Sequence, residues 1–120
     1  MKFNRLRFSK EASESLNRMK GRMGLNWNII CRIGFCISLN DKIEPNPNDY
    51  KSDGEIEIDR KILIGNEDDL YIALLKQRCL MSNIPEEQYI EYFKAHMNRG
   101  AILLSKRIAN IKDLAQLIAD

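Results

Sequence analysis

The sequence has few of the residues from which catalytic and metal centres are usually built. Its 120 residues include one histidine and three cysteines, and no two cysteines form a C-x-x-C pair. His96 has no cysteine or serine at a spacing that indicates a catalytic pair, and a lone helical histidine is usually a packing or hydrogen-bonding residue. A glycine-rich phosphate loop is also missing. We therefore expect no catalytic residue, no metal site and no cofactor.

Long apolar runs are missing as well. No stretch of about 18 apolar residues, the length that a membrane-spanning helix needs, occurs in the chain. Arg5 and Arg7 near the start are not followed by the apolar segment of a secretory signal. An odd number of cysteines does not suit a disulfide framework, so Cys31, Cys36 and Cys79 fit buried side chains in a reducing compartment. We expect a cytoplasmic protein with no membrane partner.

Charge is present but unevenly distributed. The net charge is only +2, yet residues 1–24 carry seven Lys or Arg against two acids, and residues 41–69 carry ten acids against four bases. A basic end is typical of a protein that binds a polyanion. The alternative is a solvated face that the acidic middle of the chain balances.

Hydrophobic spacing predicts a mainly α-helical single domain. Residues 3–8 alternate as in a short strand, and Ser9 can cap a first helix over 10–22, with Gly24 ending it. Asn26 can cap a second helix that reaches about residue 39. The chain thus begins with a strand-helix-helix unit over 1–40.

The remainder divides into an acidic loop or extended arm over 41–67 and a helical part over 68–120. Alternation at 55–58 and the β-rich residues 62–64 predict a small strand content within 55–64. A third helix is expected over 70–80 with an inward face of Leu70, Ala73, Leu74 and Leu75. Pro85 can open a fourth helix to about residue 105, whose inward face is Tyr89, Phe93, Met97, Ala101 and Leu104. A terminal amphipathic helix is marked by Ile108, Ile111, Leu114, Ala115 and Ile118.

The second helix is apolar on two faces. Ile29, Ile33 and Ile37 share one stripe, and Phe35 lies on another, while Arg32 is the only charged residue between 28 and 40. A helix that is apolar on two faces is buried on two faces. We expect the second face to contact another subunit, with Ile29, Ile33, Phe35 and Ile37 at the interface. The alternative is that the C-terminal helices cover it.

The order of strand, helix, turn and helix is that of a ribbon-helix-helix unit, in which strands of two chains pair and enter the DNA major groove. Arg5 and Arg7 would project together from such a strand, although a solubilising edge strand is the alternative. Arg18, Lys20 and Arg22 at the end of the first helix could reach phosphates. These five residues are our expected DNA contacts.

Five segments, in order, resemble the DndE family of DNA sulfur modification (phosphorothioation) proteins. They are residues 6–12 (LRFSKEA), the turn over 16–25 with MKGR and GL, residues 28–39 (NIICRIGFCISL), residues 71–78 (YIALLKQR) and residues 93–100 (FKAHMNRG).

This resemblance implies a small helical protein that forms tetramers and binds double-stranded DNA, with a preference for nicked duplex. It also implies partners among the other phosphorothioation proteins, including a cysteine desulfurase, and places the DNA contact at Arg18, Lys20 and Arg22. We therefore expect a non-catalytic DNA-binding subunit of that machinery. The alternatives are a ribbon-helix-helix transcriptional regulator that binds an operator, a scaffold without affinity for DNA, and an enzyme that uses His96.

Overall fold

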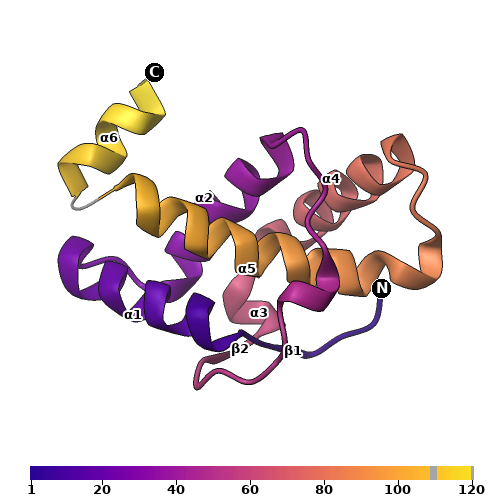
Figure 1. Ribbon diagram of the computed structural model, residues 1–120, viewed down its shortest axis with the longest axis horizontal. Helices are drawn as coiled ribbons and strands as arrows, with labels where there is room; N and C mark the ends of the chain where they lie inside the picture. Colours follow the sequence, from indigo (N-terminus) through magenta and orange to yellow (C-terminus); the bar gives the residue numbers. More distant parts are fainter. Residues whose placement is uncertain (109–110, 120) are drawn as a thin grey trace.

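The computed structural model describes residues 1–108 and 111–119 of the chain, and they form a mainly helical structure with a small two-stranded sheet (Figure 1). In chain order the elements are β1 (Arg5–Arg7), α1 (Lys10–Met23), α2 (Trp27–Asn40), η1 (Pro47–Asp49), β2 (Glu57–Asp59), α3 (Arg60–Leu63), η2 (Gly65–Glu67), α4 (Asp68–Met81), η3 (Glu86–Gln88), α5 (Tyr89–Arg107) and α6 (Ile111–Ala119). The predicted mainly α fold class is confirmed.

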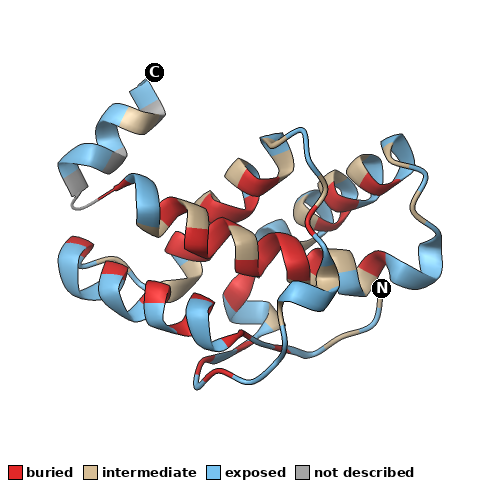
Figure 2. Cartoon of the chain, in the orientation of Figure 1, coloured by how far each residue is buried: buried red, intermediate tan, exposed pale blue. Residues whose placement is uncertain are grey.

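Helix α5 is the centre of the core, with α2, α1 and α4 packed around it. Figure 2 shows buried residues along most of its length. The predicted inward face of this helix is confirmed, because all five of its members are buried: Tyr89, Phe93, Met97, Ala101 and Leu104. Phe93 also meets Phe3 and Phe35, with ring centroids 5.0 and 5.2 Å apart, so the N-terminal arm and α2 share one aromatic cluster with α5.

Helices α2 and α5 approach each other unusually closely where Gly34 faces Gly100. A Cβ atom on Gly100 would lie 2.2 Å from the carbonyl oxygen of Gly34, and one on Gly34 would lie 2.6 Å from the carbonyl carbon of Gly100. Any side chain at either position would therefore force the backbones apart. The two glycines let α5 cover one face of α2 directly.

The ends of α1 follow from local sequence. Ser9 Oγ accepts a hydrogen bond from the backbone N–H of Ala12 at 3.2 Å, which is the N-cap that the sequence predicts. Gly24 adopts the left-handed conformation (φ 68°) and donates its N–H to the carbonyl of Lys20 at 3.0 Å. Asn26 precedes α2 as predicted, but its side chain makes no capping hydrogen bond.

Strand β1 finds its partner within the chain. It pairs antiparallel with β2, and the pair Leu6–Ile58 turns its side chains into the core. The partner seen here is a strand of the same molecule, whereas the sequence predicts a ribbon formed with a second chain. The predicted strand content near 55–64 is confirmed only at β2, since residues 60–63 form the short helix α3.

The prediction for the inward face of α4 is confirmed for Leu75, which is buried, and wrong for Leu70 and Ala73. Leu70 is 52% exposed and Ala73 is exposed, while Ile72, Leu75 and Cys79 are buried. The rotation of the helix is set by contacts outside it. Arg60 donates to both carboxylate oxygens of Asp68 at 2.7 and 2.8 Å, and the ring of Tyr71 packs edge-on against Phe35. Apolar side chains on α4 therefore remain at the surface.

The C-terminal part forms helix α6, as predicted, and Ile108 before it is buried. Of the residues that mark this helix as amphipathic, Ile111, Leu114 and Ile118 have side chains outside the described part of the structure, and Ala115 is exposed. Within the described residues, no helix combines the length and the apolar character that crossing a membrane requires.

Candidate nucleic-acid interface

The last turns of α1 carry three exposed cations, Arg18, Lys20 and Arg22. Lysine and arginine at a helix C-terminus also interact favourably with the helix dipole, so their position is stable without any ligand. Among residues 1–108 and 111–119, none of the three makes an ion pair with a carboxylate. Their charge is therefore available to a partner from outside the chain.

Two of these cations are nevertheless held in place by neutral contacts. Arg18 Nη2 donates to Ser15 Oγ at 3.3 Å and to Ser105 Oγ at 3.2 Å, which ties the end of α1 to the end of α5. Lys20 Nζ lies 4.7 Å from the ring centre of Trp27 at the start of α2. Neither contact is with a carboxylate, so neither offsets the charge of the side chain.

Arg5 and Arg7 have a different environment from the α1 cations. Arg5 Nε lies 3.1 Å from a carboxylate oxygen of Asp59, and Arg7 forms an ion pair with Glu57 and donates to the carbonyl of Gly54 at 3.2 Å. The antiparallel register produces these pairs, because it places each arginine opposite one of the two acids. The acidic stretch therefore neutralises the strand arginines, and we do not include Arg5 and Arg7 in the proposed DNA contact.

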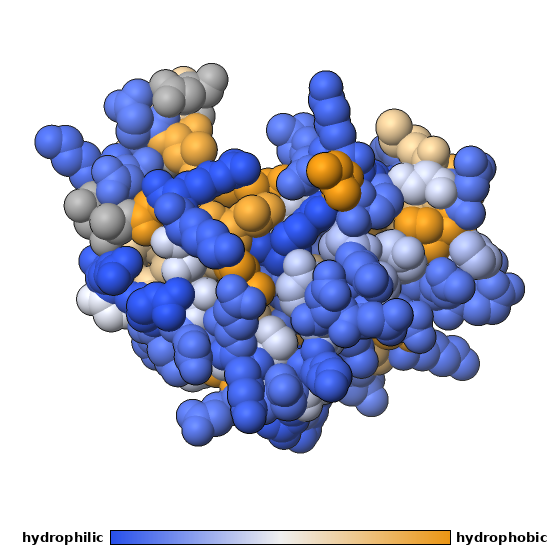
Figure 3. Space-filling model, viewed as in Figure 1, coloured by the Kyte–Doolittle hydropathy of each residue, from blue (hydrophilic) through white to orange (hydrophobic). Residues whose placement is uncertain are grey.

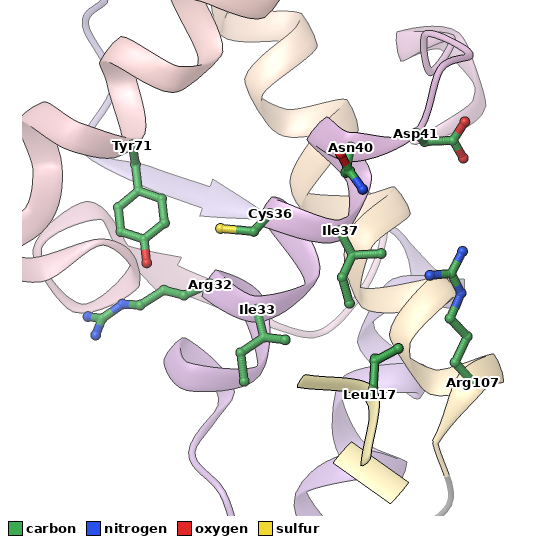
Figure 4. A pocket seen from close by; sticks show the side chains of 9 residues that line it. All are labelled: Arg32, Ile33, Cys36, Ile37, Asn40, Asp41, Tyr71, Arg107 and Leu117. Carbon is green, nitrogen blue, oxygen red and sulfur yellow. The ribbon is translucent and has the colours of Figure 1, made fainter. Parts of the chain in front are cut away.

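The outer face of α2 forms a groove of about 540 Å³ (Figure 4). Ile33, Cys36 and Ile37 line it from α2, with Tyr71 of α4 on one side and Leu117 of α6 on the other. Figure 3 shows apolar side chains at the surface where α6 meets the rest of the chain. Ile33 and Ile37, together with Ile29, which is 38% exposed, keep apolar area that the chain itself does not cover.

Phe35 does not belong to this outer face. Its side chain has no exposed area, because it packs between the rings of Tyr71, Phe93 and His96. The expectation that Phe35 lies at a subunit interface is therefore corrected. The alternative, in which the later helices of the chain cover the face of α2 that carries Phe35, holds for that face, since α5 and α4 bury it.

A polar cluster lies on the opposite side of α2, around His96. Ser38 Oγ accepts a hydrogen bond from Arg99 Nε at 2.8 Å, so its own proton is directed at His96 Nδ1, also at 2.8 Å. The proton of the neutral imidazole is then on Nε2, which faces Glu44 Oε2 at 3.6 Å. Arg78 and Ser82 donate to the other oxygen of Glu44. The cluster joins the loop after α2 to α4 and α5.

Ser38 and His96, at the centre of this cluster, are buried. Burial, and then the positive charge of Arg99, lower the pKa of His96 to about 4, so the ring is neutral near pH 7. Ser38 and His96 have no exposed area, so a substrate has no access to them. Burial raises the pKa of all three cysteine thiols, which makes them poor nucleophiles. No group of three metal-ligating side chains occurs in the described residues.

Sequence reasoning missed several residues that the fold brings to these sites. Tyr71 and Leu117 are distant in sequence from the α2 groove that they line, and Ser105 is 87 residues from Arg18. Arg32 is a further example, because its Nε donates a hydrogen bond to the carbonyl of Leu63, the last residue of α3, at 2.9 Å. No local pattern marks such contacts, because they join separate elements.

The fold and the site define a small, mainly helical protein with a basic end, an apolar groove on α2 and a buried polar cluster. The chain belongs to the DndE family, since the model of "DNA sulphur modification protein DndE" matches residues 5–112. No curated protein matches the sequence. DndE from Escherichia coli B7A, involved in DNA phosphorothioation modification, has a similar crystal structure at 25% identity (TM-score 0.69), covering 84% of this chain and 97% of that one.

A second similar crystal structure is a DndE variant with glycine-to-lysine substitutions, involved in DNA phosphorothioation. It is 23% identical, with a TM-score of 0.68, and the match covers 87% of this chain and 99% of that chain. At this identity the likeness concerns the fold. Both matches cover nearly the full length of the solved proteins and most of this chain.

Proposed function

We propose that this chain is a non-catalytic, double-stranded-DNA-binding subunit of the machinery that introduces phosphorothioates into DNA. Membership of the DndE family supports the assignment to that machinery. The observation that supports DNA binding is the set of exposed cations at the end of α1, which have no carboxylate partner among the described residues. Other phosphorothioation proteins would be its partners, in the cytoplasm, where its three free cysteines remain reduced.

The contact is with the phosphate backbone. Arg18 and Lys20 contact only neutral groups, and all three cations, Arg22 included, are exposed and can each approach a phosphate, which carries no sequence information. Binding should therefore depend little on base sequence and weaken steeply as salt rises, with a slope of about 0.9 per phosphate contacted. Nicked and intact duplexes share this backbone, so comparing them measures any preference for nicks separately.

The test is Arg18→Ala/Lys20→Ala/Arg22→Ala, measured by fluorescence anisotropy on labelled duplexes over a range of salt concentrations. We expect affinity to fall roughly 100-fold and the salt slope to fall by about 2 to 3. The matched control is Lys51→Ala/Lys61→Ala/Lys76→Ala, which removes the same charge from exposed positions on other elements. An unchanged affinity and slope in the α1 variant would refute the assignment.

We also propose that the subunit acts as a homo-oligomer, a tetramer by resemblance, through the outer face of α2. Ile29, Ile33 and Ile37 keep apolar area exposed beside the groove, which supports this face as the contact between copies. Light scattering should give four chain masses for the native protein and fewer for Ile33→Glu. Leu80→Glu, at an exposed leucine of α4, is the control that should leave the assembly intact. A monomeric native protein would refute this part of the proposal.

The ribbon-helix-helix regulator is not favoured. Such a regulator needs a strand that pairs with a second chain and presents arginines to bases, whereas β1 pairs with β2 and both of its arginines are neutralised. The non-catalytic role is supported by the burial of His96 and Ser38 and by the raised pKa values of the cysteines. If His96→Gln abolished modification while the variant stayed folded and bound DNA, this role would be wrong.

A further inference from the structure

Helices α1 and α5 end side by side. Both run toward the end of the molecule from which the chain continues to α6 (Figure 1). The hydrogen bond from Arg18 Nη2 to Ser105 Oγ, at 3.2 Å, joins the second-last turn of α1 to the last turn of α5. Whatever approaches the cations of α1 therefore also approaches the C-terminal turn of α5.

That turn of α5 carries two further exposed cations, Lys106 and Arg107. Arg107 lies at the edge of the α2 groove near Asp41 (Figure 4). The pKa of Asp41 is lowered mainly by the N–H of Ile43, with smaller contributions from Arg99 and Arg107. No ion pair of Lys106 or Arg107 with a carboxylate occurs in the part of the chain that the structure describes.

The cations at this end of the molecule come from two separate helices, α1 and α5, so the two groups of cations are spaced by the distance between the helices. The first turn of α6 contributes Lys112 and Asp113, which cancel in net charge. The axes of packed helices lie about 8–10 Å apart, and the grooves of B-DNA are roughly 6 and 12 Å wide. Cations on two adjacent helix ends can thus reach phosphates on both sides of one groove.

We propose that Lys106 and Arg107 form a second phosphate-contacting element, so that one subunit holds both strands of a duplex between the ends of α1 and α5. This inference rests on the proposed function, because it assumes that α1 contacts DNA. The competing explanation is that Lys106 and Arg107 only stabilise the negative end of the helix dipole. If Lys106 and Arg107 contact DNA, replacing them lowers the number of phosphates contacted. If they only stabilise the helix dipole, that number does not change.

The experiment compares Lys106→Ala/Arg107→Ala with the control Lys51→Ala/Lys76→Ala, which removes equal charge from exposed positions of other elements. Anisotropy on a labelled duplex over a range of salt concentrations gives affinity and slope. We expect the α5 variant to lose about 1.8 in slope and roughly 5- to 30-fold in affinity, and the control to behave like the native chain. The conservative exchange Lys106→Arg/Arg107→Lys keeps both charges and should keep both values.

The outcomes separate the two proposals. If the α5 variant matches the control while the triple variant of α1 loses binding, the second element does not exist and the proposed function stands. A lower melting temperature with an unchanged salt slope would likewise overturn the inference, because it would reveal only the dipole role. If the native chain does not bind duplex DNA at all, the proposed function fails, and the second element with it.

Discussion

The arginines around Glu44 and the cations at the end of α1 carry the same charge but differ in their partners. Arg78 pairs with Glu44 and donates to the carbonyl of Leu39, and Arg99 donates to the carbonyls of Ser38 and Ile43. In contrast, Arg18 and Lys20 at the end of α1 contact only hydroxyl groups and an aromatic ring.

This difference in partners separates cations that stabilise the fold from cations that remain available to bind a partner from outside the chain. A buried or half-buried guanidinium must be paired, because an unpaired charge away from water is costly. An exposed one needs no partner and contributes little to stability. Arg5 and Arg7 are intermediate, since they are exposed but paired. The predictions below test this order, from the largest expected effect on stability to the smallest.

Glu44→Gln should have the largest effect. It removes the charge that Arg78 pairs with and leaves that half-buried guanidinium without an acid, so the free energy of unfolding should fall by about 2–4 kcal/mol. Urea denaturation measures this, and Glu55→Gln, at an exposed acid, is the control. DNA affinity should not fall, because Glu44 is not part of the proposed contact. A loss below about 0.5 kcal/mol would mean that the cluster does not hold the loop.

The pH dependence of stability should reveal His96. Its pKa is lowered from 6.5 to about 4 in the folded chain, so the unfolded chain binds a proton that the folded chain does not. Stability should therefore fall as the pH drops from 6.5 to 4, by up to about 3 kcal/mol. Glu44, whose pKa is also lowered, adds a loss only below about its ordinary value of 4.5.

His96→Gln provides the control for this prediction. It removes the titrating ring, so the decline between pH 6.5 and 4 should flatten, whereas the decline at lower pH should remain. Thermal melts across this range measure both. A variant with the same pH profile as the native chain would show that another group causes the decline.

Arg5→Ala/Arg7→Ala should have a smaller effect, of about 1 kcal/mol or less on the free energy of unfolding, because exposed ion pairs are weak. The substitution leaves Glu57 and Asp59 unpaired at the strand. DNA affinity should fall far less than in the triple variant of α1. Chemical denaturation measures the effect on stability, and anisotropy measures the effect on DNA affinity. A loss of affinity as large as in the triple variant of α1 would show that Arg5 and Arg7 contact DNA after all.

Lys20→Ala should change stability least, by about 0.5 kcal/mol, the contribution of an exposed cation–π contact. Trp27, the only tryptophan, reports the loss of that contact through its fluorescence. Arg22→Ala is the matched control, because this cation has no ring contact among the described residues. A fluorescence spectrum that Lys20→Ala leaves unchanged would place the ammonium group away from the indole.

Much of the fold could be predicted from the sequence because it depends on neighbours along the chain. The cap at Ser9, the left-handed Gly24 and the buried face of α5 are local features, and all three are confirmed. The inward face of α4 was not predictable in this way, since Arg60 and Phe35 set its rotation from other elements. The same holds for β1, whose partner lies about 50 residues further along the chain.

The sequence by itself determined the long helices, the ends of α1, the set of cations and the family. Only the tertiary structure decided which cations are neutralised, because that depends on which acids the register of β1 and β2 and the packing of α2, α4 and α5 bring within reach. Helix formation depends on hydrogen bonds four residues apart, whereas ion pairing depends on distances across the folded chain. The sequence therefore showed where the charge is, and the fold determined which charges remain free.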